Sequence, residues 1–339
     1  MILPTNQQID AIAAEILHLR QEYEFHSFWL GTTTKGAESA EQGIALKGDM
    51  NRRLGQCIEK RAPDLEARLR FPDVRAIVTW PGGAVRLILL PLYVAGRYLK
   101  FSREIPQSRW PCRWCDGLGC ERCEGTGKRY QRTVEEIVAA PLLALSGAEG
   151  TKMHTVGRED VDARMLGRGR PFILELARPR VRRFDLAPVE ERLNRQFASE
   201  IGVRQMRFAQ PGLLERLRHL SPDKSYRARV RCAVPARRES VERLSELRDL
   251  LLQQETPRRV LHRRSNRLRP RTVRWCRVEN VAGGERVTEF DLVLRTEAGA
   301  YIKEFVSGDE GRTEPCVSRL VGIPCDCVEL DVLEVFCEL

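Results

Sequence analysis

The amino-acid sequence predicts an α+β protein made of two domains. The chain has 339 residues, a length that favours about two domains, each large enough to bury its own core. Residues 41–62 repeat an apolar residue at every fourth position, which predicts a helix with one buried stripe: Leu46, Met50, Leu54 and Ile58. Strand-like runs follow one another near the C-terminal end, at residues 273–278, 287–294, 300–306 and 328–332. The best boundary lies between Cys123 and Glu136, giving domains 1–130 and 131–339.

Local signals predict two further elements near that boundary. Residues 74–80 and 84–94 read as strands separated by a Pro-Gly-Gly turn, which indicates a hairpin. Thr133 and Glu136 have the spacing of a capping box, so a short helix should begin there. Pro141 is expected to interrupt that helix.

The composition favours a polyanionic partner and a reducing compartment. The formal net charge is +10 and the sequence pI is about 9.2, which suits a nucleic acid without naming one. The longest apolar run, residues 85–96, contains Arg86 and Pro91 and is too short for a bilayer, so no membrane segment is expected. The first residues lack a basic leader, and no signal peptide is predicted. Eleven cysteines, an odd number and partly clustered, indicate metal ligands and buried thiols in a cytoplasmic protein.

The clustered cysteines are Cys112, Cys115, Cys120 and Cys123, two Cys-x-x-Cys pairs each followed by glycines. Such pairs can turn four thiolates onto one tetrahedral zinc, and glycines allow the tight turns beneath the sulfurs. With four cysteine ligands no position stays open, so the zinc would be structural. Only four residues separate the pairs, which is short for one site. Two alternatives therefore remain: each pair joins a pair elsewhere, or the cysteines form disulfides or stay free.

Residues 157–172 form a glycine-rich loop in which Asp160 and Asp162 lie among arginines, and a strand-like run follows at residues 172–176. Nearby positive charge favours the ionised form of a carboxylate. The same arginines can grip phosphates, so an aspartate here can act as a nucleophile or base on a nucleic acid. A salt-bridged surface turn is the alternative interpretation of this loop.

Basic residues are densest between Arg258 and Arg277, where nine arginines and one histidine occur without an acid. Such a segment would repel itself without counter-anions, which favours contact with RNA or DNA. No glycine-rich nucleotide-binding fingerprint supports a methyltransferase or a kinase, and the histidines form no metal or triad pattern.

Three motifs in order resemble those of pseudouridine synthases. Residues 157–160, Gly-Arg-Glu-Asp, resemble the catalytic loop; residues 224–228, Lys-Ser-Tyr-Arg-Ala, resemble the strand with the active-site tyrosine; residues 299–305 resemble the third motif, an aliphatic residue followed by a base. The chain is most similar to the archaeal-type synthases that act on uridines 54 and 55 of tRNA. Those enzymes join a THUMP-containing accessory domain to a catalytic domain.

The resemblance implies a fold for each domain, and it raises the question of whether the cysteines bind zinc. It implies a catalytic domain with a mixed, mostly antiparallel sheet flanked by helices. It also implies an N-terminal α/β THUMP-like domain that carries residues 110–130, called here the cysteine segment. Relatives have a further Cys-x-x-Cys near the N-terminus, which is missing before Cys57 here. Either zinc is not bound, or all four ligands come from residues 112–123.

The resemblance also implies roles for individual residues. Asp160 would attack the ribose or the base, or remove a ribose proton, while the uracil leaves, rotates and rejoins through carbon. Lys303 would pair with Asp160, and Tyr226 would stack on the flipped uracil and could take the proton from its C5 position. Ile302 would pack against the ring. The remaining substrate-binding candidates are Arg158, Arg164, Tyr301, Arg259, His262, Arg263 and Arg264. No organic cofactor is implied, and structural zinc remains possible.

The sequence thus predicts a monomeric tRNA pseudouridine synthase with an essential aspartate. The register of the motif favours Asp160 over Asp162 as that aspartate. The main alternative is a non-catalytic zinc- and arginine-containing RNA-binding module, which has no need for the trio of Asp160, Tyr226 and Lys303. A different RNA-modifying enzyme would require a cofactor site that the sequence does not show.

Overall fold

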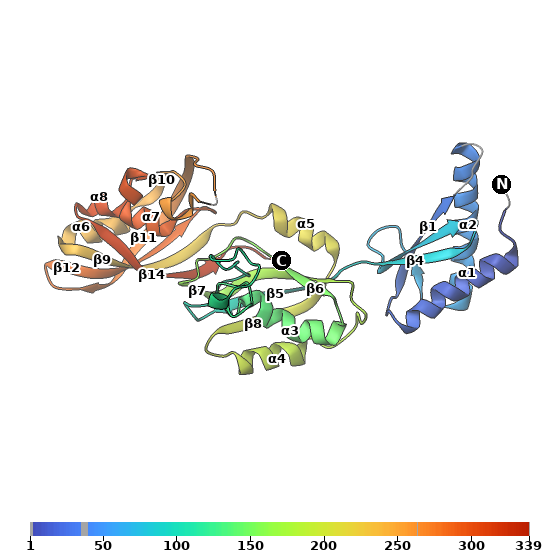
Figure 1. Cartoon of the computed structure of the whole chain (residues 1–339). Coiled ribbons are helices and arrows are strands. Elements are labelled where there is room, and N and C mark those ends of the chain that lie inside the picture. Colours follow the sequence, from blue (N-terminus) through green and yellow to red (C-terminus); the bar gives the residue numbers. More distant parts are fainter. Residues whose placement is uncertain (1–2, 35–39, 263, 339) are drawn as a thin grey trace.

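The computed structural model describes residues 3–34, 40–262 and 264–338. The molecule is elongated, with an N-terminal lobe joined to a longer body built on a single large sheet (Figure 1). Each part has its own buried hydrophobic core. Among the described residues, no helix combines the length and apolar character needed to cross a membrane.

The N-terminal lobe is a small α/β unit. Its sheet has the order β2-β1-β3-β4, formed by β1 (Ser27–Thr34), β2 (Glu66–Ala67), β3 (Val74–Trp80) and β4 (Ala84–Leu89). Helices α1 (Asn6–His18) and α2 (Ala40–Arg61) pack against it. The predicted hairpin is confirmed as the antiparallel pair β3–β4, but its second strand ends at Leu89, and residues 92–94 belong to β5 of the other sheet. The predicted apolar stripe is confirmed as the buried face of α2.

The body contains one ten-stranded sheet with the order β13-β10-β11-β12-β9-β14-β7-β5-β8, and β6 pairs with β7. Only β14 and β7 run parallel, whereas the other pairs are antiparallel, so the predicted mixed and mostly antiparallel sheet is confirmed. Its strands are β5 (Leu92–Lys100), β6 (Gly150–Thr155), β7 (Ala163–Ala177), β8 (Ile201–Ala209), β9 (Lys224–Arg237), β10 (Arg248–Gln254), β11 (Arg269–Ala282), β12 (Arg286–Thr296), β13 (Thr313–Glu314) and β14 (Cys325–Val335).

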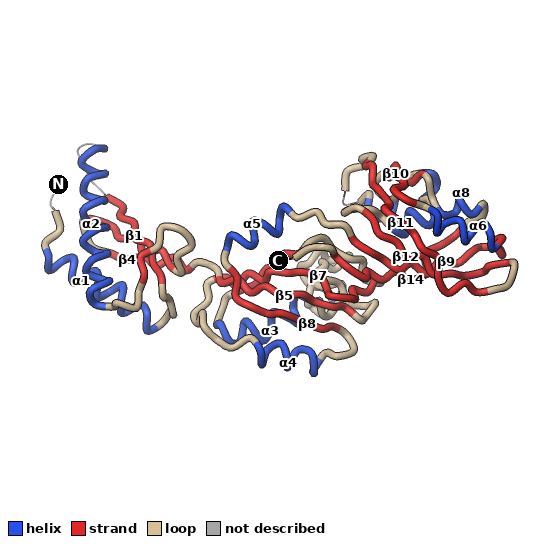
Figure 2. The backbone as a smooth tube through the Cα atoms, turned by 180° about the vertical axis from the view of Figure 1, so that it is seen from behind, coloured by secondary structure: helices blue, strands red, loops and turns tan. Residues whose placement is uncertain are grey.

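Helices cover both ends of this sheet. Figures 1 and 2 show α3 and α4 on one side of the end formed by β7, β5 and β8, α5 on the other side of that end, and α6 to α8 grouped at the opposite end. Their bounds are α3 (Val134–Ser146), α4 (Ala187–Gln196), α5 (Pro211–His219), α6 (Arg238–Glu242), α7 (Ile302–Ser307) and α8 (Val317–Val321).

Strand β5 belongs to the large sheet, where it pairs with β7 on one side and with the edge strand β8 on the other. The change from the small sheet to the large one therefore falls between Leu89 and Leu92, and it does not coincide with the sequence-based boundary at residue 130. Every residue from Val94 to Lys100 is buried, including the charged Arg97 and Lys100, so this strand is covered on both faces. The cysteine segment consequently lies on the body and not on the N-terminal lobe.

The prediction of a strand at residues 300–306 was wrong, because these residues form α7. Gly299 has a φ of +85° and Tyr301 caps the helix in an extended conformation. Ile302, Phe305 and Val306 are buried on one face, a spacing of three and four that suits a helix; short apolar runs do not distinguish the two structures.

Helix α3 begins as predicted, since the Thr133 side chain accepts a hydrogen bond from the Glu136 backbone N–H at 3.1 Å. The expected interruption at Pro141 is wrong, and the helix continues to Ser146. Proline removes one backbone hydrogen bond; here Pro141 and its neighbours Val138 and Leu142 are buried, and their packing holds the helix together.

Candidate active site

Three segments that are distant in sequence meet at one cavity of about 230 Å³. Asp160 comes from the loop between β6 and β7, Tyr226 from β9, and Ile302 and Lys303 from the first turn of α7. Gly157 begins the loop with a φ of +77°, a conformation that favours glycine. The three sequence motifs therefore contribute side chains to the same cavity.

Arg259 is the residue that holds the Asp160 carboxylate. Its Nη1 donates to Oδ1 at 3.0 Å and lies 2.9 Å from Oδ2. The same guanidinium donates through Nε to Glu304 Oε1 at 2.6 Å. Because Glu304 is buried, this second contact fixes the guanidinium in place beneath Asp160.

Lys303 makes its short contact with Asp162. Its Nζ lies 2.6 Å from Asp162 Oδ2 and 3.9 Å from Asp160 Oδ2. Lys303 therefore does not pair with Asp160 alone, as expected, but lies between the carboxylates of Asp160 and Asp162. Desolvation acts to raise the pKa of Asp162, but the hydrogen bond and charge of Lys303 lower it below its usual value.

Tyr226 is buried against the cavity, with 8% of its surface exposed. Burial raises the pKa of its phenol to about 12, and the charge of Arg170 only partly opposes this effect. The phenol is therefore protonated at neutral pH and can donate a hydrogen bond. It is a weak acceptor for the C5 proton that the sequence assigned to it.

Beneath the loop lies a buried polar network that sequence reasoning missed. Glu159 accepts hydrogen bonds from the Tyr98 hydroxyl at 2.8 Å and from Arg170 Nε at 2.9 Å. Arg170 Nη1 also donates to the Val156 carbonyl at 2.6 Å, and Gln107 donates to Tyr98 at 2.6 Å. A sequence motif marks Asp160 but gives no sign that the preceding glutamate faces inward, toward a strand assigned to the other domain.

Two buried lysines complete the support of the site. Lys100 Nζ donates to the carbonyls of Asp160 at 3.2 Å and Val161 at 2.6 Å, so β5 holds the loop backbone directly. Lys224 lines the cavity, and its hydrogen bond to the Pro222 carbonyl is long, at 3.5 Å. Burial lowers the pKa of each lysine to about 8.

The other predicted substrate-binding residues fall into two groups. Tyr301, Ile302 and Arg264 line the same cavity as Asp160, and Arg264 donates to the Tyr301 hydroxyl at 2.9 Å. Arg164, by contrast, forms a two-point ion pair with Asp331, at 2.8 and 2.6 Å. That ion pair uses Nε and Nη2 of the guanidinium, and the expected phosphate contact stays a prediction. Arg263 lies outside the described residues.

A second, wider cavity of about 1240 Å³ opens next to the first. Arg158, Asp160, Arg259, Val260 and Lys303 line both. We call the first the inner cavity and the second the outer cavity. His262 lines the outer cavity, as do Asp162 and residues of the cysteine segment. Asp160 is thus at the junction, whereas Asp162 faces only the outer cavity.

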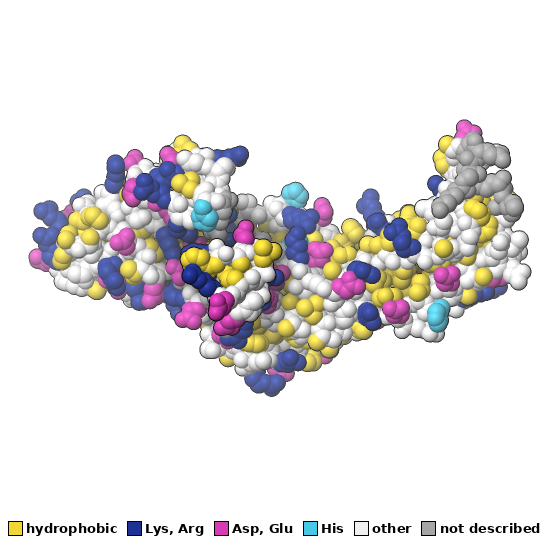
Figure 3. All heavy atoms as spheres, in the orientation of Figure 1, with side chains coloured by type: hydrophobic (Ala, Val, Ile, Leu, Met, Phe, Trp, Pro, Cys, Tyr) yellow, Lys and Arg dark blue, Asp and Glu magenta, His cyan; other side chains and the backbone are white. Residues whose placement is uncertain are grey.

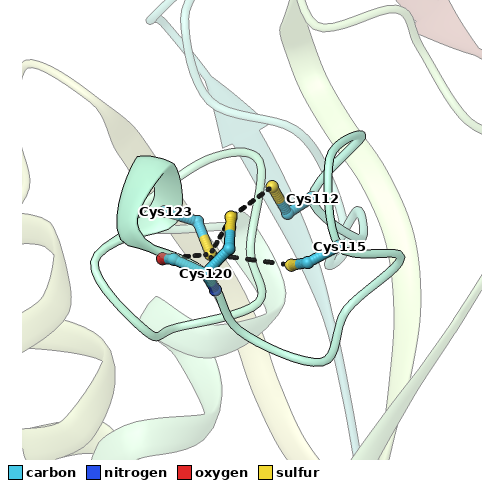
Figure 4. A group of neighbouring side chains, drawn as sticks. All are labelled: Cys112, Cys115, Cys120 and Cys123. Carbon is cyan, nitrogen blue, oxygen red and sulfur yellow. Dashed lines mark hydrogen bonds between the residues drawn. The ribbon is translucent and has the colours of Figure 1, made fainter.

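The four cysteine sulfurs converge on one point (Figure 4). All four lie within 4.8 Å of one another, and the Cys112–Cys120, Cys115–Cys123 and Cys120–Cys123 separations are 4.0, 3.8 and 3.7 Å. Tetrahedral zinc with Zn–S bonds of ~2.3 Å requires sulfurs about 3.8 Å apart, and a disulfide requires about 2.0 Å. The cluster therefore fits one four-sulfur metal site and not two disulfides.

Backbone hydrogen bonds favour the thiolate form of one of these cysteines, Cys123. Backbone N–H groups of Cys120 and Gly127 donate to the Cys123 sulfur, both at 3.2 Å. The Cys120 donor contributes most to lowering the pKa of Cys123, to about 6. Metals bind thiolates, so the lowered pKa of Cys123 favours metal binding at this sulfur. Because all four sulfurs come from residues 112–123, a metal site here would not need a further Cys-x-x-Cys pair near the N-terminus.

Similarity to known proteins defines the class of this protein as a pseudouridine synthase. The family model described as "Pus10, C-terminal" matches residues 93–336. The chain is 38% identical over 337 residues to the tRNA pseudouridine synthase Pus10 of Archaeoglobus fulgidus, covering 97% of this chain and 92% of that protein. It belongs to the Pus10 family.

Further similarities extend over most of the chain. Identity to the tRNA pseudouridine synthase Pus10 of Methanothrix thermoacetophila is 36% over 346 residues, covering 97% of this chain and 74% of that protein. Among solved structures, a Cbf5-Nop10-Gar1 complex is similar with a TM-score of 0.37 and 14% identity, covering 70% of this chain and 48% of the other. The matched region of the family model begins at β5, where the large sheet begins.

Proposed function

We propose that this chain isomerises uridine to pseudouridine in the TΨC arm of tRNA, at positions 54 and 55, with Asp160 as the essential carboxylate. The observation that carries the proposal is the meeting of Asp160, Tyr226 and Lys303 at one cavity. Relatives of the same family are named tRNA pseudouridine synthases. A non-catalytic RNA-binding module has no use for a buried phenol beside a paired aspartate.

The inner cavity suits an extruded uridine. A base must leave its stack before an enzyme can act on it, which costs a few kcal/mol. Tyr226 and Ile302 are buried side chains of the cavity wall and provide surfaces for the uracil ring. The Tyr226 phenol, protonated at neutral pH, can donate to a uracil carbonyl. Basic groups at the junction of the two cavities offset the charge of the adjacent phosphates.

Asp160 is proposed to attack the ribose or the base, or to remove a ribose proton. The reaction breaks the bond between N1 and the ribose carbon and forms one between C5 and the same carbon; C5 loses a proton and N1 gains one, so the product is an isomer of the substrate. It needs neither a redox step nor an external group, so no organic cofactor is proposed. Arg259 keeps the carboxylate in place while the detached uracil rotates. The Tyr226 phenol already carries its own proton when its pKa is about 12, so we propose that the C5 proton passes to the Asp160 carboxylate once the new bond has formed.

The cysteine cluster is proposed to bind one structural Zn²⁺ through Cys112, Cys115, Cys120 and Cys123. With four thiolates the metal has no open position for catalysis, and it would hold two loops of the outer cavity together. The monomeric state and the cytoplasmic location remain predictions.

Unmodified tRNA transcript provides the decisive test. We expect the wild-type chain to form pseudouridine, mapped after chemical blocking, in the TΨC arm. Asp160→Asn should abolish product while tRNA binding survives, because only the reacting group changes. Asp162→Asn is the matched control and should keep most activity. Product from Asp160→Asn would refute the assignment, and wild-type protein that binds tRNA without forming product would indicate a binding module.

A further inference from the structure

The outer cavity has an aromatic wall that catalysis does not use. Trp110 and Tyr130 stand at the two ends of the cysteine segment, and both line this cavity. The ends are pinned together by the bridge between Pro111 and Lys128, and the Arg129 N–H donates to the Trp110 carbonyl at 3.0 Å. The fold of the cysteine segment therefore fixes the two rings beside each other.

Arginines accompany both rings. The Trp110 and Tyr130 rings are 6.2 Å apart with an interplanar angle of 89°. The Arg158 guanidinium lies 5.1 Å from the Trp110 ring, and that of Arg129 lies 5.4 Å from Trp110 and 5.2 Å from Tyr130. Both rings are half-buried, and among the described residues neither is part of the hydrophobic core of the large sheet. The Trp110 and Tyr130 rings are therefore held in place at the cavity wall without being packed into the hydrophobic core.

This wall is continuous with the catalytic cavity. Arg158 lines both cavities and is two residues from Asp160. Figure 3 shows apolar and charged side chains side by side over the region of the cysteine segment. A nucleotide next to the extruded uridine is tethered to it by one phosphate, so its base must lie close to the junction. Aromatic rings and guanidinium planes are the groups on which unpaired bases stack.

We propose that Trp110, Tyr130 and Arg158 form a second base-binding site, which stacks the unpaired nucleobase adjacent to the target uridine. The inference rests on the proposed function in that the ligand is RNA. Stacking accepts any base, because every base has a π-face. The site would therefore set the position of the RNA in the cleft without reading its sequence. The cysteine segment would act in substrate positioning through these rings.

Fluorescent tRNA tests the proposal without relying on product. Transcripts carry 2-aminopurine at single positions flanking the target uridines, and binding is measured with the Asp160→Asn protein. We expect stacking to quench the fluorophore at one flanking position. Trp110→Ala should remove the quenching and weaken binding about 5- to 150-fold, the range of one base–aromatic stack; Trp110→Phe should retain part of both. Trp114→Ala is the matched control, since Trp114 belongs to the same segment but is 71% exposed.

An abasic substitution separates stacking from folding. If Trp110 stacks on the flanking base, the wild-type chain loses affinity when that base is removed, and Trp110→Ala then binds the abasic RNA as well as the wild type does. Equal weakening by Trp110→Ala on intact and abasic RNA, or no quenching at any flanking position, would overturn the proposal. Quenching by a chain that forms no pseudouridine would reject the proposed reaction and leave the second site intact.

Discussion

Arg259 holds the catalytic candidate Asp160 through one nitrogen, with Nη1 at 3.0 Å from Oδ1 and 2.9 Å from Oδ2. The arginine is itself fixed by the buried Glu304. Lys303 is the basic residue of the third motif. Its Nζ lies 3.9 Å from Asp160 Oδ2 and makes its shorter contact, at 2.6 Å, with Asp162 Oδ2. The orientation of the aspartate therefore depends on Arg259, a residue of the arginine-rich segment that the sequence analysis named only as a substrate-binding candidate.

This arrangement predicts an order of effects. Arg259→Met should lower the rate of pseudouridine formation about 10- to 150-fold, since a hydrogen bond to a charged group contributes about 1.5–3 kcal/mol. Lys303→Met should cost less, because its contact with Asp160 is longer. The rates are measured under single-turnover conditions, with thermal unfolding as the check on folding. Arg258→Ala, which removes an exposed neighbour paired with Glu310, is the control; a larger loss in Lys303→Met than in Arg259→Met would reverse the assignment.

The buried pair of Glu159 and Arg170 should dominate local stability. Both side chains are at most 2% exposed, and removing one partner leaves a buried charge uncompensated at a cost of about 3–5 kcal/mol. Glu159→Gln should lower the free energy of unfolding by that amount in urea titrations. Glu149→Gln breaks an ion pair with Arg178 that is more than half exposed and should cost about 0–1 kcal/mol. Similar costs for the two variants would show that the network is not stabilising.

The cysteine cluster should carry one zinc ion per chain. Elemental analysis of purified protein is expected to find that ratio, and Cys115→Ser should reduce it strongly because three thiolates bind zinc less tightly than four. Cys57→Ser, which alters a cysteine of the N-terminal lobe, should leave the metal content unchanged. Wild-type protein that contains no zinc after purification without chelators would argue against the site.

Lys224 predicts a pH dependence of stability. Burial lowers its pKa in the folded chain to about 8, whereas a lysine in the unfolded chain titrates near about 10.4. Between these values the unfolded state binds more protons, so folding stability should rise with pH across this window. Below about pH 8 both states are protonated and the full cost of burying the charge is present.

Replacing Lys224 with methionine should reduce the increase of folding stability with pH. The stability difference between Lys224→Met and the wild type should favour the variant most near about pH 7 and shrink toward about pH 10. Urea unfolding at several pH values measures it, and Lys152→Met controls for the loss of an exposed lysine on β6. A difference that stays constant with pH would show that Lys224 is not buried in its charged form.

The sequence by itself determined the elements whose pattern is local. The α2 stripe repeats every fourth residue, the β3–β4 hairpin has its Pro-Gly-Gly turn, and the cysteine pairs have ligand spacing; each of these signals lies within one short segment. The motif residues Asp160 and Tyr226 were found because their neighbours in the chain resemble a known family, and the structure places them at one cavity.

Only the tertiary structure decided which distant groups meet. The place of β5 in the large sheet, the inward direction of Glu159 and the partners of Arg259, Lys303 and Arg164 depend on pairings across 45 to 167 positions. Residues 300–306 could form a strand or a helix, and packing against the core selected the helix. The sequence shows how many arginines a segment contains, but only the folded chain shows which group each guanidinium contacts, such as Asp160 for Arg259 and Asp331 for Arg164.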